Sequence, residues 1–226
     1  RSVAAAGGEE HAQGVAQPGV VVVLVSGRAA HDARRVVGVD GVWTVGNHGA
    51  EVINPNGEVF VHEEVARYAS AIADAARVLE PMLAALRGVV LENKKRTMSV
   101  HYRGADEAIL PQLREVVEHV AADRNLHVTT GKKVFEIRPP VRVDKGSAIA
   151  SLVRDLGAAA DGASILFAGD DATDEDAFRL LRGQFPAAVT IHVGTNVDTA
   201  AEFRFGELAQ VRVLLEHLAR DVSASR

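Results

Sequence analysis

Apolar runs and helical stripes alternate at both ends of the chain, and this alternation is the clearest pattern in the sequence. The run VVVVLV at 20–25 ends at Ser26-Gly27, and the later runs SILFAG and AVTIHVG have the same character. Continuous apolar runs of this length are typical of strands buried on both faces, as in a parallel sheet. Amphipathic stripes with helical spacing occur at 144–157 and 207–222. The alternation predicts an α/β domain with a parallel sheet that is covered by helices on both faces.

The pattern changes between residues 59 and 140, where short strands follow longer helices. Each of two repeats consists of one amphipathic helix, at 62–87 and then at 106–123, followed by two short strands. The four strands read VVLENK, TMSVHYR, LHVTT and KVFEIR. We therefore predict an α+β insert, in the order αββαββ, at 59–140. It interrupts a core that is formed by 1–58 and 141–226.

Composition narrows the class of protein. With 226 residues, of which 47% are hydrophobic, the chain is long enough to bury a sizeable core. The formal net charge is −5 and no segment is a basic block, so we expect no nucleic-acid partner. The longest aliphatic run is too short to span a membrane, and no secretory signal is visible. The absence of cysteine excludes disulfides and zinc–thiolate sites, and we expect a cytoplasmic location.

Two segments have the chemistry to hold a phosphate group. Ser26, Gly27 and Arg28 follow the first apolar run, and ligands of open α/β sheets collect at the carboxyl ends of strands. A hydroxyl beside backbone N–H groups at a helix N-terminus suits a phosphate, although serine there can also be a plain helix cap. Lys145 opens another predicted helix, where the helix dipole disfavours a cation. Its compensating anion is either a ligand or the preceding Asp144.

Five acidic residues occupy seven positions after the run SILFAG. Three of them, Asp170, Asp171 and Asp174, come first. Carboxylate oxygens are the ligands that Mg²⁺ prefers, and one or two from the protein suffice when water or phosphate completes the shell. Acidic residues also favour the first turn of a helix, but one of them is enough for a cap. The cluster therefore predicts a magnesium site.

Six motifs together resemble a known family. In chain order they read SGR, GNHGAE, ENKKRTMSVHYR, KKVFEIRP, DKGSAI and GDDATDEDAF. They are similar to the signatures of the trehalose-6-phosphate phosphatases, within the haloacid-dehalogenase-like hydrolases, and they cover residues from about 20 to 205. The resemblance implies a Rossmann-like core with an inserted cap and Mg²⁺-dependent hydrolysis of trehalose 6-phosphate to trehalose and phosphate. It also implies a small-molecule sugar phosphate as substrate, and a trehalose-6-phosphate synthase domain or protein as a candidate partner.

The resemblance assigns separate sets of side chains to the phosphate, the metal and the sugar. The corresponding residues are, for catalysis, Ser26, Lys145 and Asp174; for phosphate binding, Ser26, Gly27 and Arg28; for Mg²⁺, Asp170 and Asp171; and for the sugar, Glu92, Lys94, Arg103, Lys132 and Glu136. Side-chain alternation in strands agrees with the sugar set, because it predicts that Glu92 and Lys94 share one face, as do Lys132 and Glu136. Such a face hydrogen-bonds well to hydroxyls, although a solvated sheet face has the same composition.

The sequence departs from this family at its N-terminal end. The family carries an Asp-x-Asp-Gly-Thr motif after its first strand, and the first Asp attacks phosphorus, but residues 1–19 contain no Asp. Without that carboxylate no covalent intermediate can form. We expect the core to lack its first strand and the chain to be a truncated phosphatase. The alternatives are a catalytically inactive sugar-phosphate-binding or regulatory module, or a phosphatase of sucrose phosphate or mannosyl-phosphoglycerate.

Overall fold

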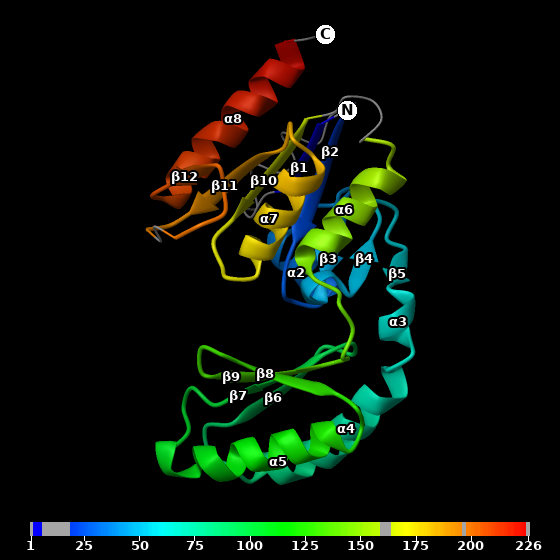
Figure 1. The fold of residues 1–226 in the computed structure, drawn as a ribbon, viewed down its shortest axis with the longest axis vertical. Helices are drawn as coiled ribbons and strands as arrows, with labels where there is room; N and C mark the ends of the chain where they lie inside the picture. The colour runs from blue at the N-terminus through cyan, green and yellow to red at the C-terminus, as the bar shows by residue number, and fades with distance from the viewer. Residues whose placement is uncertain (1, 6–18, 159–163, 196–197, 225–226) are drawn as a thin grey trace. The chain divides into compact units, whose positions relative to one another are not determined.

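The fold comes from a computed structural model that describes residues 2–5, 19–158, 164–195 and 198–224. The chain divides into two compact units (Figure 1). Unit 1 comprises Arg1–Phe60 and Val143–Arg226, and unit 2 comprises Val61–Arg142. These bounds lie within two residues of the predicted core and insert.

Unit 1 is built on an eight-stranded sheet in the order β12-β11-β10-β1-β2-β3-β4-β5. Its strands are β1 (Ser2–Ala5), β2 (Val20–Val25), β3 (Trp43–Gly46), β4 (Glu51–Ile53), β5 (Val59–Val61), β10 (Ile165–Gly169), β11 (Val189–Val193) and β12 (Phe203–Phe205). The run from β12 to β3 is parallel throughout, and β4 is antiparallel to β3. The carboxyl ends of the parallel strands therefore open on the same edge of the sheet.

The central position of this sheet is occupied by β1. Val3 pairs with Ile165 of β10 on one side and with Val21 of β2 on the other. The prediction that the core lacks its first strand is therefore corrected: residues 2–5 form it. The sequence carries no signal for this strand because Ser-Val-Ala-Ala is short and has a single β-branched residue. A parallel ladder forms through backbone groups, so two strong neighbouring strands can recruit such a segment.

Helices cover both faces of the sheet of unit 1. They are α2 (Ala30–Val37), α6 (Lys145–Asp155), α7 (Asp174–Gln184) and α8 (Leu208–Ala224), with a short 3₁₀ turn, η1 (Asn47–Gly49). On one face α6 and α7 bury an apolar cluster in which Phe167 of β10 meets Phe178 of α7 edge to face, 5.4 Å between ring centroids. On the other face Val211 and Leu215 of α8 pack against Leu24 of β2. The predicted α/β fold class is confirmed.

Unit 2 is a four-stranded antiparallel sheet in the order β6-β7-β9-β8 with helices on one face. Its elements are α3 (Glu63–Ala66), α4 (Ala69–Ala84), β6 (Val90–Asn93), β7 (Met98–His101), η2 (Glu107–Ile109), α5 (Leu110–Ala122), β8 (His127–Gly131) and β9 (Val134–Arg138). Met98, Val100 and Ile137 are fully buried against helix residues such as Leu79 and Val117. The order αββαββ is confirmed, except that the predicted helix 62–87 is divided between α3 and α4.

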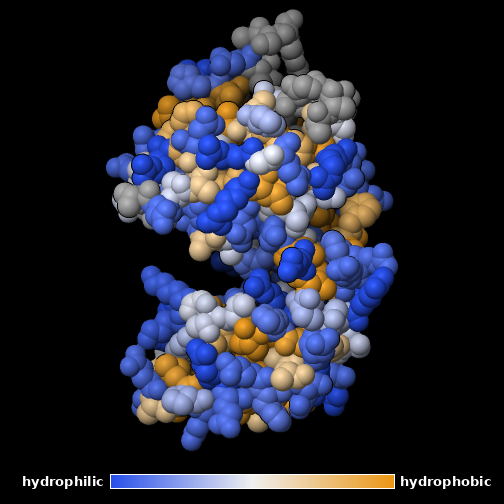
Figure 2. Space-filling model, viewed as in Figure 1, coloured by the Kyte–Doolittle hydropathy of each residue, from blue (hydrophilic) through white to orange (hydrophobic). Residues whose placement is uncertain are grey.

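Hydrophobic and hydrophilic side chains are interspersed on the surface. On the face drawn in Figure 2, hydrophobic residues form small separate patches between hydrophilic ones. Within the described ranges, none of the helices is long and apolar enough to cross a membrane.

Candidate active site

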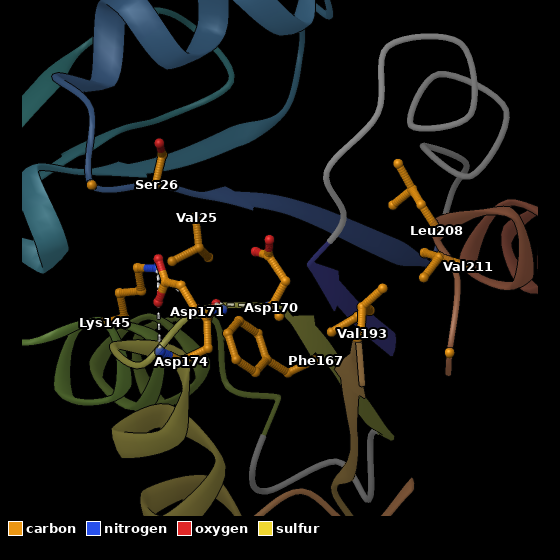
Figure 3. Close-up of a pocket in the computed structure, with 15 residues that line it drawn as sticks. Val25, Ser26, Lys145, Phe167, Asp170, Asp171, Asp174, Val193, Leu208 and Val211 are labelled. Atoms are coloured by element: carbon orange, nitrogen blue, oxygen red, sulfur yellow. Dashed lines mark hydrogen bonds and ion pairs between the residues drawn. The ribbon is translucent and has the colours of Figure 1, made fainter. Parts of the chain in front are cut away.

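A cavity of about 470 Å³ opens in unit 1 at the carboxyl ends of β2, β10 and β11 (Figure 3). Its polar wall is formed by residues that the sequence had singled out: Ser26, Gly27, Lys145, Asp170, Asp171 and Asp174. The Ser26–Gly27 turn, Lys145 and the acidic loop at 170–174 lie far apart in the sequence but line the same cavity. A site that binds both a phosphate and a metal needs these segments to be close together. Arg28 is exposed and does not line this cavity.

The acidic loop after β10 is organised around Asp174. One oxygen of its carboxylate, Oδ2, accepts hydrogen bonds from the backbone N–H groups of Asp170 (3.0 Å) and Asp171 (3.1 Å). The side chain lies so close to Gly169 that a Cβ atom there would be 2.4 Å from the Asp174 carboxyl carbon. Because residue 169 is glycine, the Asp174 side chain at the start of α7 can pack against the end of β10 and hold the loop through its backbone N–H groups.

Lys145 connects this loop to the start of α6. Its side chain is only 4% exposed, and Nζ lies 2.9 Å from Asp174 Oδ1 and 3.1 Å from Asp171 Oδ2. Two carboxylates therefore offset the unfavourable position of a cation at a helix N-terminus. Asp144, the candidate partner in the sequence, instead caps α6 by accepting a hydrogen bond from the backbone N–H of Ser147 (2.8 Å).

The two carboxylates that share Lys145 differ in their acidity. Burial raises the pKa of Asp174, and this effect outweighs the lowering by the Lys145 charge. Burial also acts on Asp171, but hydrogen bonds from Thr173 and the charge of Lys145 together hold the pKa of Asp171 below its ordinary value. The two carboxylates that share Lys145 therefore have pKa values shifted in opposite directions, upward for Asp174 and downward for Asp171.

Asp170 is the carboxylate that remains available to a ligand. Figure 3 shows its side chain standing apart from the Lys145 cluster, and the residue is exposed. Its carboxylate makes no hydrogen bond or ion pair with the rest of the described chain. In that same part of the chain, no three acidic or histidine side chains are grouped so that they could hold a metal ion. The magnesium site therefore stays a prediction, with one free carboxylate at its centre.

The hydroxyl of Ser26 is engaged by its own turn. Its Oγ accepts a hydrogen bond from the backbone N–H of Arg28 (3.1 Å). In Figure 3 the Ser26 side chain is directed away from Lys145. The helix-cap interpretation of this serine was wrong, because the N-cap position of α2 is Ala29 and no side chain caps that helix. Phosphate binding by Ser26 stays a prediction, since a rotation about one side-chain bond would redirect the hydroxyl.

The fourth acid of the motif, Glu175, has a role that the sequence analysis missed. It is buried in α7, and its carboxylate accepts hydrogen bonds from Thr199 Oγ1 and from the backbone N–H of Ala200, both 2.7 Å. Burial alone would raise the pKa of Glu175, but these hydrogen bonds outweigh it and hold the pKa below its ordinary value. Glu175 therefore anchors Thr199 and Ala200, which lie shortly before β12. An acid on the buried stripe of an amphipathic helix was the available signal.

Unit 2 carries a polar sheet face opposite its helices. Glu92, Ser99 and Glu136 lie side by side in one cross-strand row. Ser99 donates a hydrogen bond to Glu136 Oε2 (2.8 Å), and Lys94 Nζ lies 3.6 Å from the same oxygen. The prediction that Lys132 shares the strand of Glu136 was wrong, because Lys132 lies in the turn between β8 and β9.

Arg103 also lies in a turn, after the end of β7, and not in the strand predicted for it. The tight connections of the short strands take up residues that the pattern had counted as extended. Glu92 is paired with a second residue of the same face, His101, whose Nε2 is 2.9 Å from Glu92 Oε2. The two glutamates of the sugar set are thus each held by a neighbouring side chain of β7.

The fold defines the class of protein. The crystal structure of a trehalose-6-phosphate phosphatase related protein superposes on this chain with a TM-score of 0.82 and 22% identity, covering 100% of both chains. The architecture is a haloacid-dehalogenase-like fold, with a parallel core and an α+β insert. Residues 15–206 match the sequence model of the trehalose-phosphatase family, and the chain belongs to that family. The resemblance drawn from the motifs is confirmed.

Curated relatives from bacteria and plants agree with this assignment. A trehalose-phosphate phosphatase of Mycolicibacterium paratuberculosis is 36% identical over 88% of this chain and 52% of its own length. Trehalose-phosphate phosphatase B of Arabidopsis thaliana is 34% identical over 86% of this chain and 55% of its own length. The chain therefore spans about half the length of these relatives.

Proposed function

We propose that this chain carries the substrate-binding machinery of a trehalose-6-phosphate phosphatase, which hydrolyses trehalose 6-phosphate to trehalose and phosphate. The observation that supports it most directly is the buried Lys145, which Asp171 and Asp174 hold at the wall of a cavity that also contains the Ser26–Gly27 turn. Family membership names the reaction class. A trehalose-6-phosphate synthase domain or protein would supply the substrate.

The phosphoryl group would bind between the Ser26–Gly27 turn and Lys145. The ammonium group of Lys145 can donate several hydrogen bonds. Its partner Asp171 is half exposed, so a phosphate oxygen can take the place of one Asp171 oxygen at Nζ. The displaced carboxylate of Asp171 would then be solvated by water. The stronger pairing with the buried Asp174 would keep the ammonium in place. Lys145 thus acts as a fixed positive charge that stabilises the negative charge of the transferring group.

Mg²⁺ fits the donor set that the cavity offers. Mg²⁺ is commonly held by one or two carboxylates, with waters and substrate phosphate oxygens completing its shell. Asp170 would be the direct ligand, and Asp171 the neighbouring carboxylate. When bound, the ion neutralises charge on the phosphoryl oxygens. The exposed, unengaged carboxylate of Asp170 is what supports this assignment.

In the family the chemical step needs the first Asp of the Asp-x-Asp-Gly-Thr motif, and residues 1–19 contain no Asp. In the family reaction, an Asp oxygen forms a bond to phosphorus while the bond to the sugar oxygen breaks and that oxygen takes a proton. Water then hydrolyses the phosphoaspartate. Because β1 lies between β2 and β10, a residue following β1 would reach the edge of the sheet that carries Ser26 and Asp170.

The function is tested by supplying that residue. Replacing residues 1–18 with the N-terminal segment of a family member that carries the Asp-x-Asp-Gly-Thr motif is expected to raise phosphate release from trehalose 6-phosphate at least about a thousand-fold. Release would be measured with Mg²⁺ and with EDTA, and it should depend on Mg²⁺. The same graft with Asp170→Asn is the control and should be nearly inactive.

Two outcomes of this experiment favour other functions. A graft that binds trehalose 6-phosphate without turnover would identify the chain as a sugar-phosphate-binding or regulatory module, which the absence of Asp from residues 1–19 favours. A graft that prefers sucrose phosphate or mannosyl-phosphoglycerate in the same assay would identify a phosphatase of a different sugar phosphate.

The sugar set of unit 2 gives a second expected result. Glu136→Ala should weaken binding of trehalose 6-phosphate by about tenfold or more, because a charged hydrogen bond to a hydroxyl is lost. Affinity for inorganic phosphate should not change. Isothermal titration of both compounds measures the difference. Glu118→Ala on the exposed side of α5 is a matched control. Equal losses for the two compounds would argue against a sugar-binding role of this face.

A further inference from the structure

The short turn η1 has an unusual backbone. Asn47, His48 and Gly49 follow one another with φ angles of 49°, 56° and 104°. Left-handed backbone is uncommon in residues other than glycine, although Asn and His tolerate it better than most. Two such residues in succession store strain that the surrounding structure must hold in place. The motif GNHGAE, which contains this turn, has no role in the binding scheme described so far.

On one side, η1 contacts the turn that carries Ser26. The backbone N–H of Asn47 donates to the carbonyl of Arg28 (2.7 Å), and that of His48 donates to the carbonyl of Ser26 (3.3 Å). The imidazole of His48 lies against Gly27, where a Cβ atom would be 2.5 Å from ring atom Cε1. The His48 ring therefore occupies the space that any side chain at position 27 would need.

On the other side, η1 contacts the start of α6. Gly49 lies against the carbonyl of Asp144, the residue immediately before Lys145, and a Cβ atom on Gly49 would be 2.3 Å from that oxygen. This carbonyl also accepts a hydrogen bond from the hydroxyl of Ser147 (3.0 Å). No side chain fits between the turn and the helix start, so the position of Lys145 is tied to the position of η1.

A buried carboxylate anchors the turn itself. Glu51, which is 8% exposed, accepts hydrogen bonds at Oε1 from Asn47 Nδ2 (2.9 Å) and from the backbone N–H of Ala30 (2.7 Å). Ala30 is the first residue of α2, directly after the Ser26 turn. The turn is thus fixed to β4 and to α2 while it contacts both phosphate-binding segments.

We propose that His48 is a positioning residue that sets the separation between the Ser26–Gly27 turn and Lys145. This inference rests on the proposed function, in which those two segments bind one phosphoryl group. Such groups must be held within about half an ångström of their working geometry. The His48 ring packs against Gly27, and Gly49 packs against the carbonyl of Asp144. The turn η1 therefore lies between the Ser26–Gly27 turn and the start of α6 and, as a spacer, fixes the distance between them.

The test compares phosphate affinity among variants of the whole chain. His48→Asn removes the ring but keeps a residue that accepts left-handed backbone, and it should weaken binding of inorganic phosphate and trehalose 6-phosphate at least about tenfold. Gly27→Ala, whose methyl group would collide with the ring, should weaken both at least as much. The double variant Gly27→Ala with His48→Gly should recover part of the lost affinity, because removal of the ring makes room for the methyl group.

The readouts separate positioning from loss of fold. Isothermal titration gives the affinities, and binding of trehalose, which lacks the phosphate, should be unchanged in every variant. Gly183→Ala is the matched control, since a methyl group there meets nothing within 4 Å. Wild-type affinity in His48→Asn, or a double variant that binds no better than Gly27→Ala alone, would overturn the spacer role. If the unaltered chain binds trehalose 6-phosphate but not inorganic phosphate, the spacer inference fails and the proposed function stands. If it binds neither, the proposed function fails and the inference fails with it.

Discussion

Replacing Lys145 with methionine is expected to lower the free energy of unfolding at neutral pH by about 3 kcal/mol, because it leaves a buried carboxylate without its cation. Lys145 and Asp174 are both nearly inaccessible to water, at 4% and 5% exposure. Methionine matches the length of the lysine stem, so the loss reports charge and not packing. The variant should also lose most of its affinity for inorganic phosphate. Urea unfolding and isothermal titration measure the two effects.

Two further variants make this result specific. Lys145→Met combined with Asp174→Asn should regain much of the lost stability, since neither partner of the buried pair then carries a charge. Phosphate affinity should stay low in the double variant because the cation is still absent. Arg179→Met removes the cation of an exposed pair with Asp176 and should cost about 1 kcal/mol or less. A loss below 1 kcal/mol in Lys145→Met would contradict the picture of a buried ion cluster.

Glu175→Gln is expected to cost about 2 kcal/mol of stability at neutral pH, because charged hydrogen bonds to Thr199 and to the backbone of Ala200 are weakened. Folding holds the pKa of Glu175 below its ordinary value of 4.5. A carboxylate of this kind contributes stability above its unfolded pKa and loses that contribution as pH falls through its folded pKa. The difference between wild type and variant should therefore be largest at neutral pH and should shrink in acid.

Urea unfolding across a pH series measures this difference, and Asp176→Asn on the exposed side of α7 is its control. Hydrogen exchange of the Ala200 amide should become faster in Glu175→Gln, since that amide loses its charged acceptor. A stability difference that stays constant from neutral pH into acid would show that the ionised carboxylate is not the stabilising form.

The elements with strong local patterns were predictable from the sequence. Strands β2, β10 and β11 are continuous apolar runs because both of their faces are buried. Helix α6 has an amphipathic stripe because only one of its faces is buried. Strand β1 left no such trace. Its Ser-Val-Ala-Ala sequence becomes a central strand only because β2 and β10 lie on either side of it.

The residues that pair with Lys145 were not predictable from the sequence. The sequence brought Lys145 and the acidic loop to one edge of the sheet, but it offered Asp144 as the nearest anion. The pairing with Asp171 and Asp174 depends on how α6 packs beside α7, which no local pattern encodes. The contacts of η1 were hidden for the same reason, since His48 meets Gly27 and Gly49 meets Asp144 only in the folded chain.

The division of unit 1 into two segments has a kinetic consequence. Its central pairing joins Val3 to Ile165, so the whole of unit 2 lies in the chain between the partners. Contacts that are distant in sequence form slowly, because the closure of a long loop costs entropy before the contact is gained. Unit 2 is made of hairpins and neighbouring helices from one continuous stretch. Its collapse shortens the loop that the sheet of unit 1 must close, so the insert that is proposed to hold the sugar also speeds the assembly of the core.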